Sequence, residues 1–143
     1  MPLAPEYQAM FEQLAAAGPS PSLSEIPVAD ARDVYRAMRP VNPDLAIHAT
    51  EDRQVSGPLG DIPIRIYRPE GEGPFGTLVY FHGGGWVIGD IGTCDAVCRE
   101  LATLANIVVV SVDYRMAPEH VFPAAVDDCY AVVEWVSTNQ DPV

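Results

Sequence analysis

The sequence predicts an α/β fold: an antiparallel first strand pair, then parallel strands with helices on both faces of the sheet. Residues 77–82 and 107–114 are near-continuous apolar runs rich in β-branched residues, which is typical of strands covered on both faces. Residues 94–105, between these runs, place apolar side chains at helical spacing. This order of strand, helix and strand favours a parallel pair joined by a right-handed crossover.

The other elements follow from periodicity. Residues 4–17 and 28–38 have apolar residues three and four apart, so they predict two amphipathic helices that must cover another part of the protein. Residues 62–69 alternate cleanly and residues 47–55 alternate weakly, which indicates the antiparallel pair. Residues 123–137 return to helical spacing and begin with a proline, which suits the first turn of a helix.

Composition narrows the class of protein. An apolar fraction of 48% in 143 residues supports one small domain with a real core. The net charge is −12 and every basic residue is arginine, so nucleic acid and anionic lipid are poor partners. No apolar run reaches the roughly 18 residues that a membrane span needs, and no secretory signal precedes the first helix. We therefore expect a cytoplasmic protein without a membrane span.

The three cysteines, Cys94, Cys98 and Cys129, do not suggest a metal site. Zinc sites need about four ligands, and neither a histidine nor a further cysteine stands at a useful spacing. We expect buried free thiols instead.

The segment LVYFHGGGWVIGD, residues 78–90, carries the strongest sign of chemistry. Ligands of α/β folds bind where loops leave the carboxyl ends of parallel strands, and three glycines there let backbone N–H groups approach an anion. Phosphate loops have a different glycine spacing or a lysine, and this chain has neither. From the glycines alone, an oxyanion-binding loop and a tight loop beside a core tryptophan both remain open.

Together with VSVDYRMAPEHVFPAAVDDCYAVVEWV (residues 110–136), this segment resembles hormone-sensitive-lipase-type carboxylesterases, the bacterial family IV group of the α/β-hydrolase fold. The resemblance implies a helical cap segment over residues 1–43 and the N-terminal half of the hydrolase core over residues 44–143. It also implies that the N–H groups of Gly84 and Gly85 form an oxyanion hole, with Gly83 supporting the turn.

The resemblance assigns supporting roles to neighbouring residues. His82 would brace the loop through its ring rather than act as the base, and Trp86 would pack under the loop or line the acyl pocket. Arg115 and Glu119 would pair with each other and hold the loop that follows residues 107–114. Asp95, at the start of the next helix, is expected to cap that helix.

The nucleophile motif of a serine esterase, Gly-x-Ser-x-Gly, does not occur in these 143 residues. We therefore expect the nucleophile, acid and base to lie elsewhere, and the chain alone to be inactive. A complementary C-terminal half, a complementary chain or self-association would complete the sheet. The expected substrate is a small-molecule ester, and no cofactor or metal is implied. A non-catalytic ligand-binding or receptor-like member of the same fold is the alternative, and amide hydrolysis in the same pocket also remains open.

Overall fold

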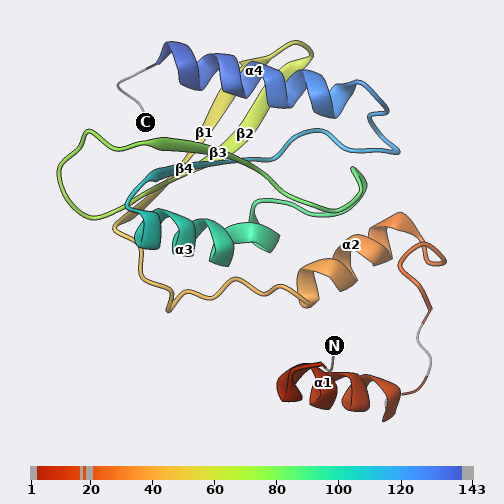
Figure 1. Cartoon of the computed structure of the whole chain (residues 1–143). Helices are drawn as coiled ribbons and strands as arrows, with labels where there is room; N and C mark the ends of the chain where they lie inside the picture. The colour runs from red at the N-terminus through yellow and green to blue at the C-terminus, as the bar shows by residue number, and fades with distance from the viewer. Residues whose placement is uncertain (1–2, 17, 19–20, 140–143) are drawn as a thin grey trace.

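A computed structural model of the protein describes residues 3–16, 18 and 21–139. Its centre is a four-stranded sheet in the order β1-β2-β4-β3 (Figure 1). The strands are Ala49–Gly57 (β1), Gly60–Arg68 (β2), Thr77–Phe81 (β3) and Val108–Val112 (β4). β2 pairs antiparallel with β1 and with β4, whereas β3 runs parallel to β4. The predicted antiparallel first pair and the predicted parallel pair are both confirmed.

The residue pattern of the strands explains this sheet. In β2, Ile62, Ile64 and Ile66 lie in one apolar cluster, while Tyr67 lies in a second cluster on the opposite face. Every residue of β4 is buried: Val108, Val110 and Val112 enter the first cluster, and Val109 enters the second. Complete burial of such a side chain contributes roughly 1.5–3 kcal/mol relative to leaving it exposed.

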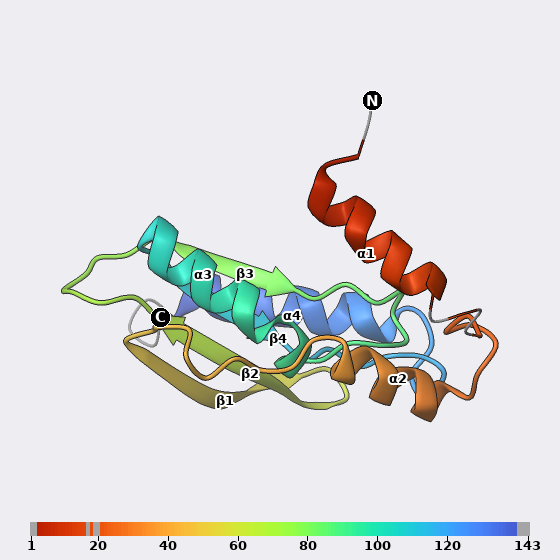
Figure 2. The same ribbon diagram turned by 90° about the horizontal axis from the view of Figure 1, so that it is seen from below.

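One helix covers each face of the sheet, as predicted (Figure 2). Helix α4, Ala124–Thr138, packs Ala125 and Val132 into the first cluster. Helix α3, Asp95–Ala105, follows the short 3₁₀ turn η1, Gly92–Cys94, and packs Cys98 and Ala102 into the second cluster. Cys94 and Cys98 are buried free thiols, as expected, whereas the free thiol of Cys129 is only partly buried.

The expectation that Asp95 caps α3 is wrong. Cys94 precedes the helix without a side-chain cap, and Asp95 is the first helical residue. The Asp95 side chain is fully buried and accepts hydrogen bonds from Tyr67 (2.9 Å) and Arg99 (2.6 Å). Its carboxylate therefore ties α3 to β2 from inside the protein.

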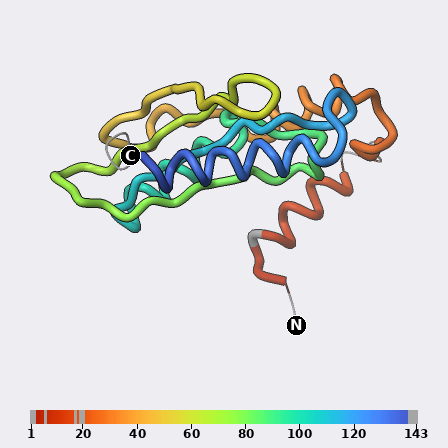
Figure 3. Tube along the Cα trace, turned by 90° about the horizontal axis from the view of Figure 1, so that it is seen from above, coloured from red at the N-terminus to blue at the C-terminus, as the bar shows by residue number. Residues whose placement is uncertain are grey.

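The two helices at the N-terminus differ in what they contact. Helix α2, Val28–Ala37, buries Ala31 and is bound to the loop after β3. Helix α1, Pro5–Ala16, lies apart from the sheet (Figure 3), and its apolar residues are exposed: Tyr7, Met10, Phe11 and Leu14. Both predicted helices are confirmed, but the expectation that each covers another part of the protein holds only for α2. The division into a cap segment (residues 1–43) and a core (residues 44–143) stays a prediction. None of the helices in the described part of the chain is long and apolar enough to cross a membrane.

Candidate active site

The glycine-rich loop leaves the carboxyl end of β3, next to the carboxyl end of its parallel neighbour β4. Four residues of this loop have positive φ angles: Gly84 (140°), Gly85 (62°), Trp86 (60°) and Gly89 (106°). Trp86 is the only one with a side chain, and such a residue in the left-handed region is uncommon and strained. The loop therefore has a defined, partly strained backbone.

Close approaches explain two of the glycines. A Cβ atom on Gly84 would lie 1.7 Å from the Ile88 carbonyl oxygen, and one on Gly89 would lie 2.4 Å from Nδ1 of His82. Gly83 and Gly85 have open space at the corresponding position. Gly84 and Gly89 are thus required by packing inside the loop, whereas the other two glycines only leave their own positions without a side chain.

The ring of His82 is buried and stacks on Tyr114, with 4.4 Å between the ring centroids. Nδ1 lies 3.1 Å from the Gly83 carbonyl oxygen, and because a carbonyl can only accept, Nδ1 carries the proton. The Tyr114 hydroxyl donates to the His82 carbonyl at 2.5 Å. Nε2 is buried without a partner among the described residues. These contacts connect the His82 ring to the base of the loop and to Tyr114.

The internal hydrogen bonds also orient the next two N–H groups. In a planar trans peptide, the C=O and the N–H of one unit point in opposite directions. The Gly83 carbonyl is held by His82, and the Gly84 carbonyl accepts from Val87 (3.2 Å) and Ile88 (3.1 Å). The N–H groups of Gly84 and Gly85 therefore point away from the loop interior. Neither N–H donates to an acceptor in the described part of the chain.

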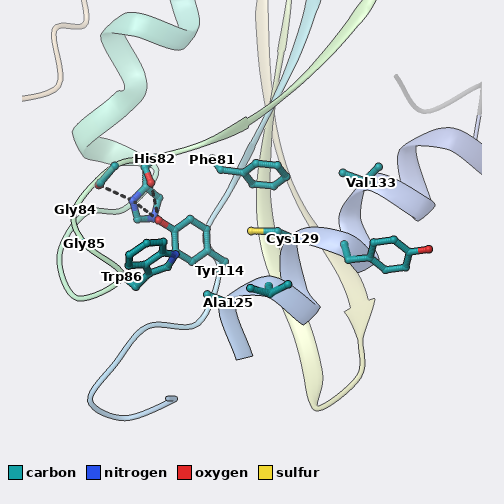
Figure 4. A pocket seen from close by; sticks show the side chains of 12 residues that line it. Phe81, His82, Gly84, Gly85, Trp86, Tyr114, Ala125, Cys129 and Val133 are labelled. Carbon is teal, nitrogen blue, oxygen red and sulfur yellow. Dashed lines mark hydrogen bonds between the residues drawn. The ribbon is translucent and has the colours of Figure 1, made fainter. Parts of the chain in front are cut away.

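A pocket of about 620 Å³ lies against this loop (Figure 4). Besides residues 82–86, its walls come from β3, Tyr114 and one side of α4: Phe81, Ala125, Val126, Cys129, Tyr130 and Val133. These walls are almost entirely apolar or aromatic, and residues 83–85 contribute backbone without side chains. Apolar pockets with a few convergent polar groups are typical of ligand sites.

The predicted ion pair between Arg115 and Glu119 is wrong. Arg115 binds both carboxylate oxygens of the buried Asp128 on α4, at 2.8 and 2.5 Å. Glu119 instead accepts two hydrogen bonds from Arg32 on α2, at 2.8 and 2.7 Å, and this contact holds its pKa down at about 2. The two residues still connect the loop after β4 to its neighbours, but to different helices.

Sequence reasoning missed the α4 wall of the pocket and the contact of Arg32 with the loop. The α4 wall had a signal, because Val126, Tyr130 and Val133 follow a helical stripe. Nothing in the sequence assigned that stripe to a pocket rather than to the core. Cys129 also lines the pocket, but burial raises the pKa of its thiol to about 11, which disfavours the reactive thiolate.

The described serines do not provide a nucleophile at this pocket. Ser22 and Ser24 precede α2, Ser56 lies in β1 and Ser137 lies in α4, while Ser111 is fully buried in β4. None of these five lines the pocket, and Ser20 lies outside the described residues.

A family model described as the alpha/beta hydrolase fold matches residues 78–142. The chain is 48% identical over 106 residues to the carboxylic ester hydrolase LipN of Mycobacterium tuberculosis, an alignment covering 73% of this chain and 28% of LipN. It is 46% identical over 113 residues to the esterase LipI of the same organism, covering 76% of this chain and 33% of LipI. The chain thus spans about a third of the length of these relatives.

Solved structures agree with this match. The hyperthermophilic esterase of the archaeon Pyrobaculum calidifontis superimposes with a TM-score of 0.87 at 41% identity, covering 99% of this chain and 46% of that protein. The structural and sequence matches show that the chain has part of an α/β-hydrolase fold. Within that fold, its similarity to carboxylesterases of the hormone-sensitive-lipase type is confirmed.

Proposed function

We propose that the chain contributes the oxyanion-binding part of a carboxylic-ester hydrolase, with the N–H groups of Gly84 and Gly85 as the donors. The observation that supports this most strongly is the orientation of these groups. Each preceding carbonyl is bound inside the loop, and both N–H groups lack an acceptor among the described residues beside a 620 Å³ pocket. Fixed donors of this kind stabilise the negative charge that develops during acyl transfer, and one donor contributes about 2.7–4 kcal/mol.

The proposed reaction requires a serine, a histidine and an acid from outside these 143 residues. The histidine removes the hydroxyl proton as the serine oxygen bonds to the ester carbonyl carbon. The carbonyl π electrons move onto the oxygen, which Gly84 and Gly85 bind. The C=O bond then re-forms, and the alcohol leaves with the proton from the histidine. Water next attacks the acyl group in the same way, losing a proton to the histidine, and the serine oxygen leaves with that proton.

The lining of the pocket favours an uncharged substrate with an apolar acyl chain. Phe81 and Trp86 present aromatic surface, and no charged side chain lines the pocket in the described part of the chain. His82, Gly83, Arg115 and Glu119 act as loop support in this proposal. Residues 1–43 act as the cap segment, with α2 on the loop after β3.

Hydrolysis of p-nitrophenyl acetate and butyrate by the protein at its full natural length tests this function. We expect turnover with both esters, and essentially none from a polypeptide of residues 1–143 alone, because loss of a triad serine costs about 10⁶ in turnover. Equal turnover by the short polypeptide would contradict the proposal. Tight binding of the esters without turnover at full length would favour the receptor-like alternative.

A further inference from the structure

Helix α2 reaches the glycine-rich loop through Arg32, whose side chain is only 19% exposed. Its Nε donates to the Val87 carbonyl oxygen at 2.8 Å, and its Nη2 donates to the Ala117 carbonyl oxygen at 3.0 Å. Nη1 and Nη2 each also donate to the carboxylate of Glu119. The guanidinium group therefore has a fixed position with one N–H directed at the loop.

The bond to Val87 is the first link of a directional chain of hydrogen bonds. The Val87 carbonyl shares its peptide unit with the Ile88 N–H, which donates to the Gly84 carbonyl at 3.1 Å. The Gly84 carbonyl shares its peptide unit with the Gly85 N–H. Donors and acceptors thus run in one direction, from the Arg32 guanidinium through two peptide units to the Gly85 amide at the pocket.

We propose that Arg32 is a positioning residue that polarises and orients the Gly85 N–H through this two-peptide relay; the proposal rests on the ester-hydrolase function above. Hydrogen bonds in a chain strengthen one another, and a cationic first donor is stronger than a neutral one. Electron density withdrawn at Val87 makes the Ile88 N–H a better donor, and the same effect passes through Gly84 to Gly85. The relay thereby strengthens the donor that faces the developing oxyanion.

The charge of Glu119 does not cancel this effect. Glu119 is bound by the two terminal nitrogens and its side chain is 53% exposed, so solvent screens its charge. The bond from Nε to Val87 is partly buried and lies on the opposite side of the guanidinium fork. Glu119 therefore mainly fixes the orientation of Arg32.

Arg36 offers a matched control on the same helix. It lies one turn further along α2 and binds the same loop through the Asp90 carboxylate at 2.6 Å, and it also pairs with Asp33. None of the described hydrogen bonds of Arg36 reaches a loop carbonyl. Loss of Arg36 therefore weakens the attachment of α2 without breaking the relay.

The test compares Arg32→Gln, Arg32→Lys and Arg36→Gln in the protein at its full natural length. For p-nitrophenyl butyrate we expect Arg32→Gln to lower kcat about tenfold with little change in KM, because a donor is weakened rather than removed. Arg32→Lys keeps a cationic donor and should restore kcat to within about threefold of the wild type. Arg36→Gln should keep kcat within about twofold of the wild-type value.

Selective ¹⁵N-glycine labelling supplies a second readout that does not depend on activity. Arg32→Gln should move the Gly85 amide proton resonance upfield more than that of Gly84, whose peptide unit is held by His82. Arg36→Gln should not shift the Gly85 amide proton resonance more than that of Gly84. If Arg32→Gln does not fold by circular dichroism, Arg32→Lys must give a smaller shift in the same direction.

Equal kcat losses in the Arg32 and Arg36 variants, or equal shifts of Gly84 and Gly85, would overturn the relay. A loss of affinity alone, seen as a raised KM at unchanged kcat, would do the same. If the wild type hydrolyses no ester, the proposed function fails, and the Gly85 resonance still decides whether the relay exists.

Discussion

Gly84 occupies a position that no other residue can fill without moving the loop. Its φ of 140° excludes a side chain, and so does the Ile88 carbonyl oxygen, which would lie 1.7 Å from a Cβ atom at this position. We expect Gly84→Ala to lower kcat by roughly 10²–10³, because the displaced loop loses an oxyanion donor. It should also lower the free energy of unfolding by about 1–3 kcal/mol.

Gly83→Ala is the matched comparison for that stability loss. Gly83 has no positive φ and open space at its Cβ position, so alanine should leave the stability unchanged or raise it by about 0.4–1 kcal/mol. Chemical denaturation of both variants measures the difference. Similar stabilities for the two variants would contradict this account of the loop.

Asp113 provides a prediction about pH. Burial raises the pKa of its carboxyl above the ordinary value of 3.8, and His82 opposes the increase only partly. The folded state therefore binds the proton more tightly, and stability is lost as the pH rises from 3.8 through the pKa of the folded state. We expect Asp113→Asn to have a higher Tm than the wild type at pH 7. This difference in Tm should disappear when the pH falls below the ordinary carboxyl pKa of 3.8. If the account is wrong, thermal melts across this pH range would show the same difference in Tm between Asp113→Asn and the wild type at every pH.

At the scale of elements, one ion pair joins the loop after β4 to α4. Asp128 is 1% exposed and accepts hydrogen bonds from the backbone N–H and the guanidinium of Arg115. Because Asp128→Ala leaves these donors without their acceptor, we expect it to cost about 3 kcal/mol of stability. The exposed neighbour Asp127 is the control, and Asp127→Ala should cost less than about 1 kcal/mol in urea denaturation. Equal losses would contradict a structural role for the pair.

The elements themselves were predictable because their periodicity is strong. The alternation of β2 and the apolar run of β4 gave the correct strands, and the spacing in α3 gave the correct crossover helix. The pairing of charges was not predictable in the same way. Arg115 and Glu119 are close in sequence, but the backbone directs their side chains to Asp128 and Arg32. Sequence spacing in a loop does not specify side-chain direction, and Arg32 lies 55 residues from Val87.

The candidate site was partly predictable for the same reason. The glycines and the location of their loop followed from the motif and from the parallel strands. The closing contacts of His82 with Gly83 and Tyr114, and the α4 wall of the pocket, depend on how distant segments pack. Only the structure brings these groups together.

For the molecule as a whole, the edge strand β3 is the feature with the clearest consequence. β3 ends the sheet order, and its side chains Leu78 and Phe81 are 36% and 40% exposed. Such an edge favours pairing with another strand. We expect a polypeptide of residues 1–143 alone to self-associate in light scattering, and Leu78→Lys to reduce this. Leu104→Lys changes an exposed position on α3 and should not reduce self-association. An equal reduction by the two variants would exclude the β3 edge as the interface.

The central claim concerns where the amides of Gly84 and Gly85 are directed. A crystal structure of the protein at full natural length, inactivated with diethyl p-nitrophenyl phosphate, tests it most directly. We predict a phosphoryl oxygen at about 2.7–3.1 Å from both backbone nitrogens, with the loop unchanged. A phosphoryl oxygen bound elsewhere, with these two amides donating to carbonyls of the protein, would contradict the account.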